Sequence, residues 1–426
     1  MTLRIDQRTF LTTIDIVSAV VALYLVVRRP TRRWIVTALV AVLGGAALGW
    51  LTCWIAVDLL DVFGVDLTPI TRMWVMLAFA GIALAIVNLW RSRWWRKTVA
   101  IIAIPLFLLT GAAGINVDFG AYRNLNDVIG VNPYAALDLK HETGAVEKIG
   151  TDYTRGWTAP AKMPTHGTIG SVDIPGTVSH FGARAAVVYL PPAALTAKPP
   201  ALPVIIAFAG QPGAPVDMFV SGNLGALVDQ YAAKHNGIAP IVVAPDQLST
   251  PDHNPMCVDS ALGNSATYIM TDVIGWVKSH LRVSSDKDAW ATAGYSQGAT
   301  CAVQFTAAHP DVFGAALAVS SEAGPTIGAD TVRRGFGGST AAFHAAQPAA
   351  LLSRNAPYPG TLMIFSAGAN DKKYLKFANK LAADALAAGV DAQLITSPHS
   401  AHDWNTVRYS LATGFPLIVS HMGLSG

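Results

Sequence analysis

A serine flanked by glycines is the most informative chemical feature of the sequence. Residues 292–300 read Thr-Ala-Gly-Tyr-Ser-Gln-Gly-Ala-Thr and contain Gly-x-Ser-x-Gly at Gly294, Ser296 and Gly298. The apolar segment 288–293 predicts a buried strand, and the small residues after the motif predict the start of a helix. In that context the serine stands at a turn so sharp that only glycines fit beside it. We interpret Ser296 as a candidate nucleophile; the alternative is an ordinary strand-to-helix loop.

A serine hydroxyl needs a base and a residue that orients the base. In α/β-hydrolases the chain order is serine, acid, histidine. Asp371 follows an apolar segment and precedes a predicted helix, so it is the candidate acid; the alternative is that it only caps that helix. Glu322, after the strand that follows the nucleophile helix, is the rival acid. His399 and His402 both lie in the loop after the last predicted strand, and we favour His402 as the base.

The tetrahedral oxyanion of ester cleavage needs two backbone N–H donors. One comes from the residue after the nucleophile, Gln297, and one from the loop after an early strand. The glycine-rich turn 209–213 follows such a strand. Gln211 is the better donor there because Pro212 has no N–H. The alternative is that this segment is a plain turn.

The elements that must hold these residues alternate between strands and helices from residue 167 onward. Segments 167–175 and 183–190 predict a pair of strands, and continuous apolar runs predict strands buried on both faces. These runs are 203–209, 238–244, 288–293, 314–320, 361–366 and 392–396. Helices are predicted at 267–281, 372–388 and 406–421. This alternation predicts an α/β-hydrolase domain at 167–426, with a doubly wound, mostly parallel sheet.

The first quarter of the chain has a different composition. The whole sequence is 52% hydrophobic and only 13% charged, where ordinary soluble domains are about a quarter charged. Four apolar runs of about 20 residues, at 10–27, 34–57, 70–90 and 98–117, predict four transmembrane helices in residues 1–117, followed by a linker at 118–166. The net charge of +3 gives no argument for a nucleic-acid partner.

The connections between these runs predict their orientation. The first and third connections are basic and the second is acidic. The basic residues are Arg28, Arg29, Arg32 and Arg33 in the first and Arg91, Arg93, Arg96 and Lys97 in the third. The positive-inside rule then puts the N-terminus and everything after about residue 118 outside the cytoplasm of a plasma membrane. Asp15 is the one obvious acid within the runs, and we interpret it as an interfacial residue.

The three cysteines have no zinc-ligand spacing, and the chain has no phosphate-binding loop. The sequence therefore predicts neither a metal nor a cofactor. Cys53 lies within an apolar run. Cys257 and Cys301 lie in the outer domain, in segments expected to end close together, and we predict a disulfide between them. The alternative is two buried thiols.

Several short segments carry a family resemblance: 184–192, 207–210, Gly294-Tyr-Ser-Gln-Gly298, Gly368-Ala-Asn-Asp371 and His402-Asp-Trp404. They resemble the esterase D and antigen 85-like group of α/β-hydrolases, in which a histidine followed by Asp-Trp is a recurrent form of the catalytic base. The resemblance implies that role for His402. The four-helix start is similar to membrane-anchored esterases of mycolic-acid-producing actinobacteria. Antigen 85 members use a glutamate as the acid, which keeps Glu322 open.

The sequence thus predicts a membrane-anchored serine esterase acting on lipid-linked esters or glycolipids of the cell envelope. The alternatives are a mycolyltransferase-like acyltransferase, which passes the acyl group to a sugar hydroxyl, and an inactive binding or scaffolding module. The segment between Glu322 and Arg354 has no clear predicted element. We expect either a mobile cap over Ser296 or an ordinary surface loop there. The oligomeric state is left open.

Overall fold

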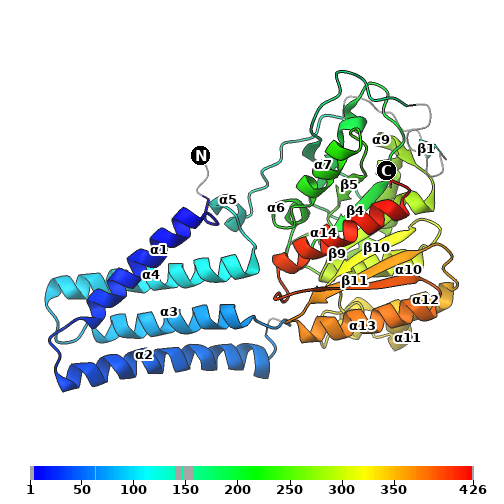
Figure 1. Cartoon of the computed structure of the whole chain (residues 1–426). Helices are drawn as coiled ribbons and strands as arrows, with labels where there is room; N and C mark the ends of the chain where they lie inside the picture. Colours follow the sequence, from blue (N-terminus) through cyan, green and yellow to red (C-terminus); the bar gives the residue numbers. More distant parts are fainter. Residues whose placement is uncertain (1–3, 63, 140–145, 148–156, 425–426) are drawn as a thin grey trace. The chain divides into compact units, whose positions relative to one another are not determined.

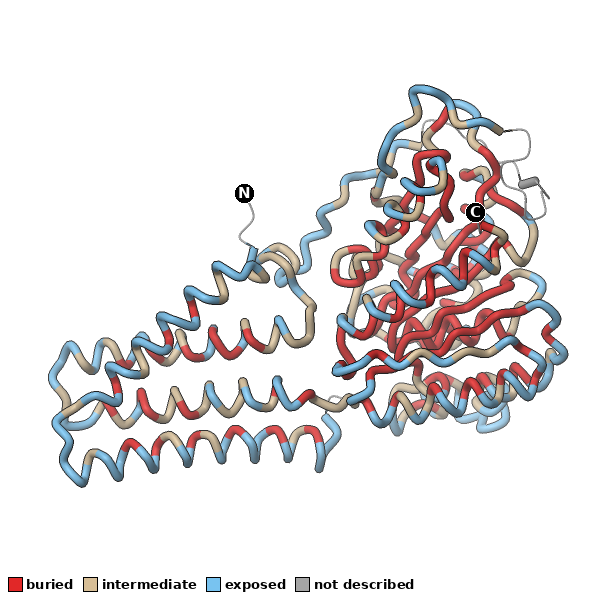
Figure 2. Tube along the Cα trace, viewed as in Figure 1, coloured by how far each residue is buried: buried red, intermediate tan, exposed pale blue. Residues whose placement is uncertain are grey.

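The structure is a computed structural model that describes residues 4–62, 64–139, 146–147 and 157–424. Much of the predicted linker, at 140–145 and 148–156, lies outside the described residues. The chain divides into two compact units. The first comprises Met1–Asn132 with His399–Asn405, and the second Pro133–Pro398 with Thr406–Gly426. Figure 1 draws their elements and Figure 2 the burial of each residue.

The first unit is helical, and its helices match the four apolar runs. They are α1 (Arg8–Val26), α2 (Arg32–Cys53) with its π-helical extension η1 (Trp54–Leu59), α3 (Pro69–Val87), α4 (Trp94–Phe119) and the short α5 (Leu125–Val128). The first four helices are long and apolar enough to cross a membrane. Thr68 caps α3 by accepting a hydrogen bond from the Thr71 N–H, and Gly120 ends α4 with a φ of 62°.

Few side chains of these four helices are buried: only 17 to 33% of each apolar span is buried, and the rest is partly or fully exposed (Figure 2). A small cluster that includes Leu25, Leu84 and Phe107 forms their core. Close packing of α2 on α3 depends on glycine, because a Cβ added to Gly45 would lie 2.6 Å from the carbonyl oxygen of Phe79. The exposed apolar surface suits a hydrocarbon surrounding.

The two basic connections meet at one end of the helices. Arg28 donates to the carbonyl of Arg91, and the guanidinium of Arg96 donates to the carbonyls of Tyr24 and Leu25 at the C-terminus of α1. That cation therefore satisfies carbonyls that have no partner within their own helix.

The opposite end of the same helices is acidic. Arg72 makes two hydrogen bonds to Asp58, at 2.6 and 3.0 Å, and the Asp118 carboxylate accepts from the Thr71 hydroxyl at 2.6 Å. The Ile5 N–H donates to the Arg123 carbonyl at 2.9 Å. The residue before α1 and the residues after α4 therefore lie at this same end.

The second unit is built on an eight-stranded sheet with the order β12-β11-β10-β9-β4-β5-β3-β2. The strands are β2 (Thr168–Val172), β3 (Ala186–Leu190), β4 (Val204–Phe208), β5 (Ile241–Ala244), β9 (Trp290–Tyr295), β10 (Ala315–Val319), β11 (Leu362–Gly368) and β12 (Asp391–Ser397). Pairs involving β3 are antiparallel, and the other pairs are parallel. This confirms the predicted mostly parallel sheet.

Short two-residue strands lie outside this sheet. They are β1 (Val146–Glu147), which pairs in parallel with β8 (Val283–Ser284), and β6 (Asp259–Ser260), which pairs with β7 (Gly263–Asn264).

Helices cover both faces of the sheet. They are α6 (Asp217–Val220), α7 (Leu224–Lys234), α8 (Ser265–Thr267) with η3 (Tyr268–Val273) and α9 (Ile274–His280), α10 (Gln297–Ala308), α13 (Lys372–Ala387) and α14 (Trp404–His421), with 3-10 turns η2 (Pro192–Leu195) and η4 (Lys287–Ala289). Thr292 of β9 donates to the Ala302 carbonyl of α10, whereas Leu317, paired with Ala293, packs against Gly414 of α14. Because neighbouring strand residues point to opposite faces, α10 and α14 lie on opposite sides.

The segment between Glu322 and Arg354 differs from the prediction of no clear element. It contains a π-helical turn, η5 (Thr331–Gly335), and two helices, α11 (Thr340–Ala345) and α12 (Pro348–Asn355). Pro348 starts α12 at its first position, which suits a residue without an N–H. Leu351 and Leu352 are its buried apolar side chains, with Pro348 beside them. So few apolar positions give no readable helical period.

Candidate active site

Ser296 stands at the sharp turn between β9 and α10. Its φ of 55° and ψ of −119° form a backbone conformation that residues with side chains seldom adopt. The turn is fixed from both sides, because the Ser296 N–H donates to the Val319 carbonyl at 2.9 Å and its own carbonyl accepts from the Thr300 N–H at 3.1 Å. A Cβ on Gly294 would clash with the Gly298 carbonyl, and one on Gly298 with the Ala209 carbonyl. The glycine spacing is therefore required by the turn.

The parallel strands bring three of the other candidate residues, Gln211, Glu322 and Asp371, to the same edge of the sheet as Ser296. Ser296 follows β9, Gln211 follows β4, Glu322 follows β10 and Asp371 follows β11. His402 belongs to the loop that follows β12. Since all five strands are parallel, their carboxyl ends lie at one edge, where active sites of open α/β sheets occur.

The two candidate acids differ in their surroundings. Asp371 is fully buried, and its carboxylate accepts the Tyr374 N–H at 3.2 Å, so it does cap α13. Glu322 is half-buried beside Thr300, whose hydroxyl donates to its carboxylate at 3.4 Å and accepts its backbone N–H at 3.1 Å. Burial raises the pKa of the Glu322 carboxyl to about 7, against the smaller opposing effects of the Thr300 hydrogen bond and the Lys373 charge. A substantial share of Glu322 is therefore uncharged at neutral pH.

The two candidate bases also differ. His399 is exposed and has a φ of 59°, whereas His402 is buried, with 7% of its surface exposed. Asp403 shapes the loop around His402: its two carboxylate oxygens accept the Ser400 hydroxyl at 2.6 Å and the Ala401 N–H at 2.7 Å. The aspartate of the His-Asp-Trp segment thus has a local structural role.

The two candidate oxyanion donors lie in segments next to Ser296. Gln297 is the first residue of α10, so its N–H has no carbonyl partner within the helix. The loop before Gln211 runs beside the nucleophile, because a Cβ added to Gly210 would lie 3.4 Å from the Cβ of Ser296. Within the part of the chain that the structure describes, neither Gln297 nor Gln211 has a recorded backbone N–H hydrogen bond. Both donors are available to a ligand.

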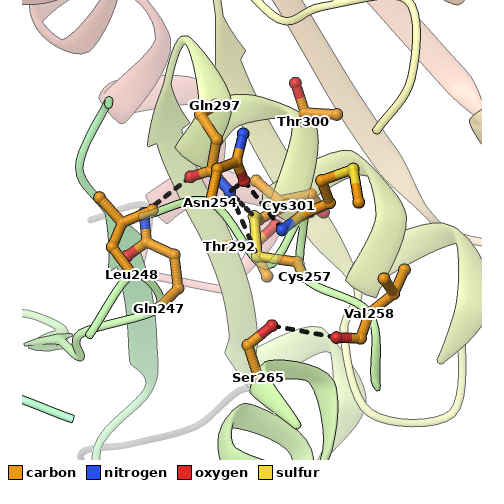
Figure 3. Close-up of a disulfide and its surroundings, with 12 residues drawn as sticks. Gln247, Leu248, Asn254, Cys257, Val258, Ser265, Thr292, Gln297, Thr300 and Cys301 are labelled. Atoms are coloured by element: carbon orange, nitrogen blue, oxygen red, sulfur yellow. Dashed lines mark hydrogen bonds between the residues drawn. A yellow bond between two sulfur atoms is a disulfide. The ribbon is translucent and has the colours of Figure 1, made fainter. Parts of the chain in front are cut away.

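A buried amide network joins these two segments, and no motif in the sequence predicts it. The side chain of Gln247, after β5, donates to the Ala209 carbonyl at 2.7 Å and to the Gln297 side-chain oxygen at 3.0 Å. The Gln297 amide nitrogen in turn donates to Asn254 at 3.1 Å, as Figure 3 shows. Gln247 and Asn254 therefore position the turn before Gln211 and the start of α10 relative to each other.

The structure confirms the predicted disulfide between Cys257 and Cys301, whose Cα atoms lie 5.5 Å apart (Figure 3). The Gln297 amide nitrogen lies 3.2 Å from the Cys301 sulfur. The disulfide thus contacts the same residue whose N–H is the first candidate oxyanion donor. Cys53 is free and buried in α2.

A separate cavity of about 180 Å³ lies at the other edge of the sheet. Leu190, Ile241 and Arg282 line it, and Ile241 begins the parallel strand β5. It is therefore remote from the carboxyl ends of the strands and from the candidate nucleophile.

Comparisons with known proteins identify the family and the fold of the chain. The model of the family described as "Putative esterase" matches residues 182–414. An uncharacterized protein of Corynebacterium glutamicum is 31% identical over 435 residues, which cover 98% of this chain and 96% of that protein.

Two solved structures resemble the sheet-containing part in fold. A ferulic acid esterase has a TM-score of 0.51 and 20% identity, covering 60% of this chain and 98% of its own. An S-formylglutathione hydrolase from Agrobacterium tumefaciens has a TM-score of 0.50 and 16% identity, covering 61% and 97%. Both likenesses concern the fold alone.

Proposed function

Because the chain belongs to this esterase family and is a serine hydrolase, we propose that it hydrolyses acyl esters through a triad of Ser296, His402 and Asp371. The observation that carries the proposal is the backbone of Ser296. A φ of 55° on a residue with a side chain costs on the order of 1 kcal/mol or more. Such a conformation suits a serine that is presented to a substrate at a strand-to-helix turn.

Two differences in environment support the choice of acid and base. A triad acid must be charged to stabilise the imidazolium that forms on the base. The raised pKa of Glu322 makes it a poor choice for that role, whereas Asp371 is a buried residue in the predicted chain order. Similarly, burial of His402 shields it from water, while His399 is exposed.

In the proposed reaction the Ser296 hydroxyl oxygen attacks the ester carbonyl, and His402 takes the hydroxyl proton. The Gln297 and Gln211 N–H groups donate to the oxyanion of the tetrahedral intermediate. As the intermediate collapses, the ester C–O bond breaks and His402 gives its proton to the leaving alcohol. Water then attacks the acyl-enzyme with His402 again as the base, which releases the carboxylic acid and restores Ser296.

We further propose that the four apolar helices anchor the enzyme in the plasma membrane with the hydrolase domain outside. The charge distribution supports this orientation, since Arg28 and Arg96 lie at one end of the helices and Asp58 and Asp118 at the other. An anchored active site meets membrane-bound esters at a raised effective concentration. This favours a lipid-linked ester of the envelope as the substrate.

The proposal is tested with a fluorophosphonate probe and a panel of acyl esters on the full-length protein. We expect covalent labelling and ester hydrolysis by the wild type, and neither by Ser296→Ala, with helical content and thermal transition retained. Labelling at full strength in the variant would show that Ser296 is not the nucleophile. Adding a sugar acceptor and analysing the products distinguishes hydrolysis from acyl transfer.

The orientation has its own test. A reporter that works only outside the cytoplasm, fused after Gly130, should be active, and a cytoplasmic reporter fused there should be silent. The reverse result would contradict the predicted topology.

A further inference from the structure

The helical unit contains a groove between α1, α3 and α4. Its volume is about 450 Å³, within the usual range of roughly 300–1,000 Å³ for small-molecule sites. Small side chains line it, among them Ala19 and Ala22 of α1, Ala78 of α3 and Gly111 of α4. Figure 1 shows α1 running obliquely to the other three long helices. The oblique path and the small residues together leave the space open.

A second cavity of about 370 Å³ continues the groove toward the acidic end of the helices. Asp15 and Trp74 line both cavities. From Leu11 to Val26 of α1 the two extend over about 22 Å, at 1.5 Å per helical residue. The combined site is therefore a long channel, apolar in its inner part and polar at one end.

The polar end of this channel is connected through the chain to the loop that contains His402, the candidate base. Asn405 lines this end and donates to the Asp118 carbonyl at 2.6 Å. Asn405 is three positions after His402 in the chain, so their Cα atoms lie within about 11 Å of each other in any conformation. A ligand at this end is necessarily close to the His402 loop.

Two carboxylates at the polar end can accept further hydrogen bonds. Asp118 uses one oxygen for the hydroxyls of Thr68 and Thr71. In the described residues, its other oxygen and both oxygens of Asp15 have no recorded partner. Hydroxyl groups would bind them, whereas a phosphate would be repelled.

The volume of the inner, apolar part of the groove limits what can bind there. A partner helix about 10 Å across would need more than about 1,000 Å³ between Asp15 and Val26 alone. The groove offers less than half of that space. A single hydrocarbon chain fits it, and the apolar lining gives such a chain an environment like the bilayer that it leaves.

We propose that this groove binds the acyl chain of the ester substrate, while Asp15 and Asp118 accept hydrogen bonds from hydroxyl groups of an uncharged head group. The inference rests on the proposed esterase function and narrows its substrate to an acylated sugar or polyol. The helices would then select the substrate as well as anchor the enzyme.

The test compares two esters on the full-length protein in phosphatidylcholine vesicles: a sugar monopalmitate in the bilayer and 4-nitrophenyl butyrate in solution. Ala19→Trp places an indole in the groove. Val20→Trp is the matched control, because Val20 is adjacent, 60% exposed and outside the groove lining. We expect Ala19→Trp to lower the palmitate-to-butyrate turnover ratio at least tenfold and Val20→Trp to change it less than twofold.

An unchanged ratio in Ala19→Trp overturns the groove proposal. Failure of the wild type on both esters counts instead against the esterase function. If Ala19→Trp loses its helical content, the smaller Ala22→Leu is used, with an expected threefold fall in the ratio; an unchanged ratio there has the same meaning.

A binding measurement separates the groove from turnover. In Ser296→Ala, a palmitoyl sugar carrying a photoreactive group on its chain should label peptides of α1, α3 and α4. Labelling should fall at least fivefold when Ala19→Trp is added and stay within twofold when Val20→Trp is added. Labelling that is absent from these peptides, or insensitive to Ala19→Trp, overturns the proposal.

The head-group part is tested by Asp15→Asn. We expect the preference for the sugar ester over a phosphatidylglycerol of the same chain length to fall at least fivefold. An unchanged preference removes Asp15 from head-group recognition.

Discussion

The helical unit and the sheet unit use apolar side chains in opposite ways. In the helices these side chains point outward, as with Leu23 at 63% and Leu43 at 66% exposure. In the sheet unit every residue of β3, β4, β9, β10 and β11 is buried. Hydropathy is high in both regions, so hydropathy alone does not distinguish a surface made for lipid from a core made by folding. The period and length of the apolar runs distinguish the two kinds of region.

The largest expected effect concerns the proposed triad, whose histidine belongs to the helical unit and whose serine and aspartate belong to the sheet unit. His402→Ala should lower kcat by about 10⁴-fold or more, since triad members act as a unit, and His399→Ala should change it little. Likewise Asp371→Asn should cost far more than Glu322→Gln. Steady-state hydrolysis of a soluble ester measures all four. If either pair reversed, the assignment would move to the other residue.

Variants of the cysteines allow a direct comparison of the stability of the two regions. Replacing both Cys257 and Cys301 by serine should lower the free energy of unfolding by about 4 kcal/mol, because the disulfide closes a loop of 44 residues in the unfolded chain. Cys53→Ala in α2 should cost less than about 1 kcal/mol. Denaturant unfolding followed by tryptophan fluorescence measures both. Equal losses would mean that the disulfide contributes nothing beyond burial of its sulfurs.

A pair of leucines sharpens the contrast between core and lipid-facing surface. Leu317→Ala in β10, where the side chain is 2% exposed, should destabilise the sheet unit by about 3 kcal/mol through the cavity it leaves. Leu43→Ala in α2 should cost well under 1 kcal/mol in detergent, because detergent chains fill the space. Thermal unfolding of the two variants under identical conditions is the measurement. A large loss in Leu43→Ala would indicate a protein partner on that face.

The smallest of these effects concerns the pH dependence of Glu322. Its pKa rises to about 7 in the folded protein from an ordinary value of 4.5, so the folded state holds the proton more tightly. The stability contribution is full below about pH 4.5 and is lost as the pH rises through 7, by at most about 3 kcal/mol. Glu322→Gln should flatten the stability profile between pH 5 and 8. A wild-type profile that rises across that range would contradict the assigned burial.

The sheet and the long helices could be predicted from the sequence because their apolar runs have the lengths of buried strands and of membrane-spanning helices. The apolar runs before Gln211, Ser296 and Asp371 became β4, β9 and β11. Helix α12 was missed because its two buried leucines are adjacent and show no repeat. The end of β9 was placed two residues early, since Gly294 and Tyr295 belong to the strand as well as to the motif.

The candidate site was predictable where chemistry leaves a motif and unpredictable where it depends on tertiary contact. Gly-x-Ser-x-Gly identifies its turn because of the steric limits at Gly294 and Gly298. Gln247 meets Gln297 across 50 residues of chain, and nothing near either residue marks the pairing. The roles of Asp371 and His402 remain predictions from chain order and resemblance.

The backbone of Ser296 has a consequence for how far this chain could be stabilised. Glycine adopts a φ of 55° without steric cost, so Ser296→Gly should relieve about 1 kcal/mol of strain in the folded state, offset in part by the extra freedom of glycine in the unfolded chain. The substitution also removes the hydroxyl. The residue best suited to the turn is therefore not the one suited to the proposed chemistry, and a screen for thermal stability alone would drive this protein toward a form without its proposed nucleophile.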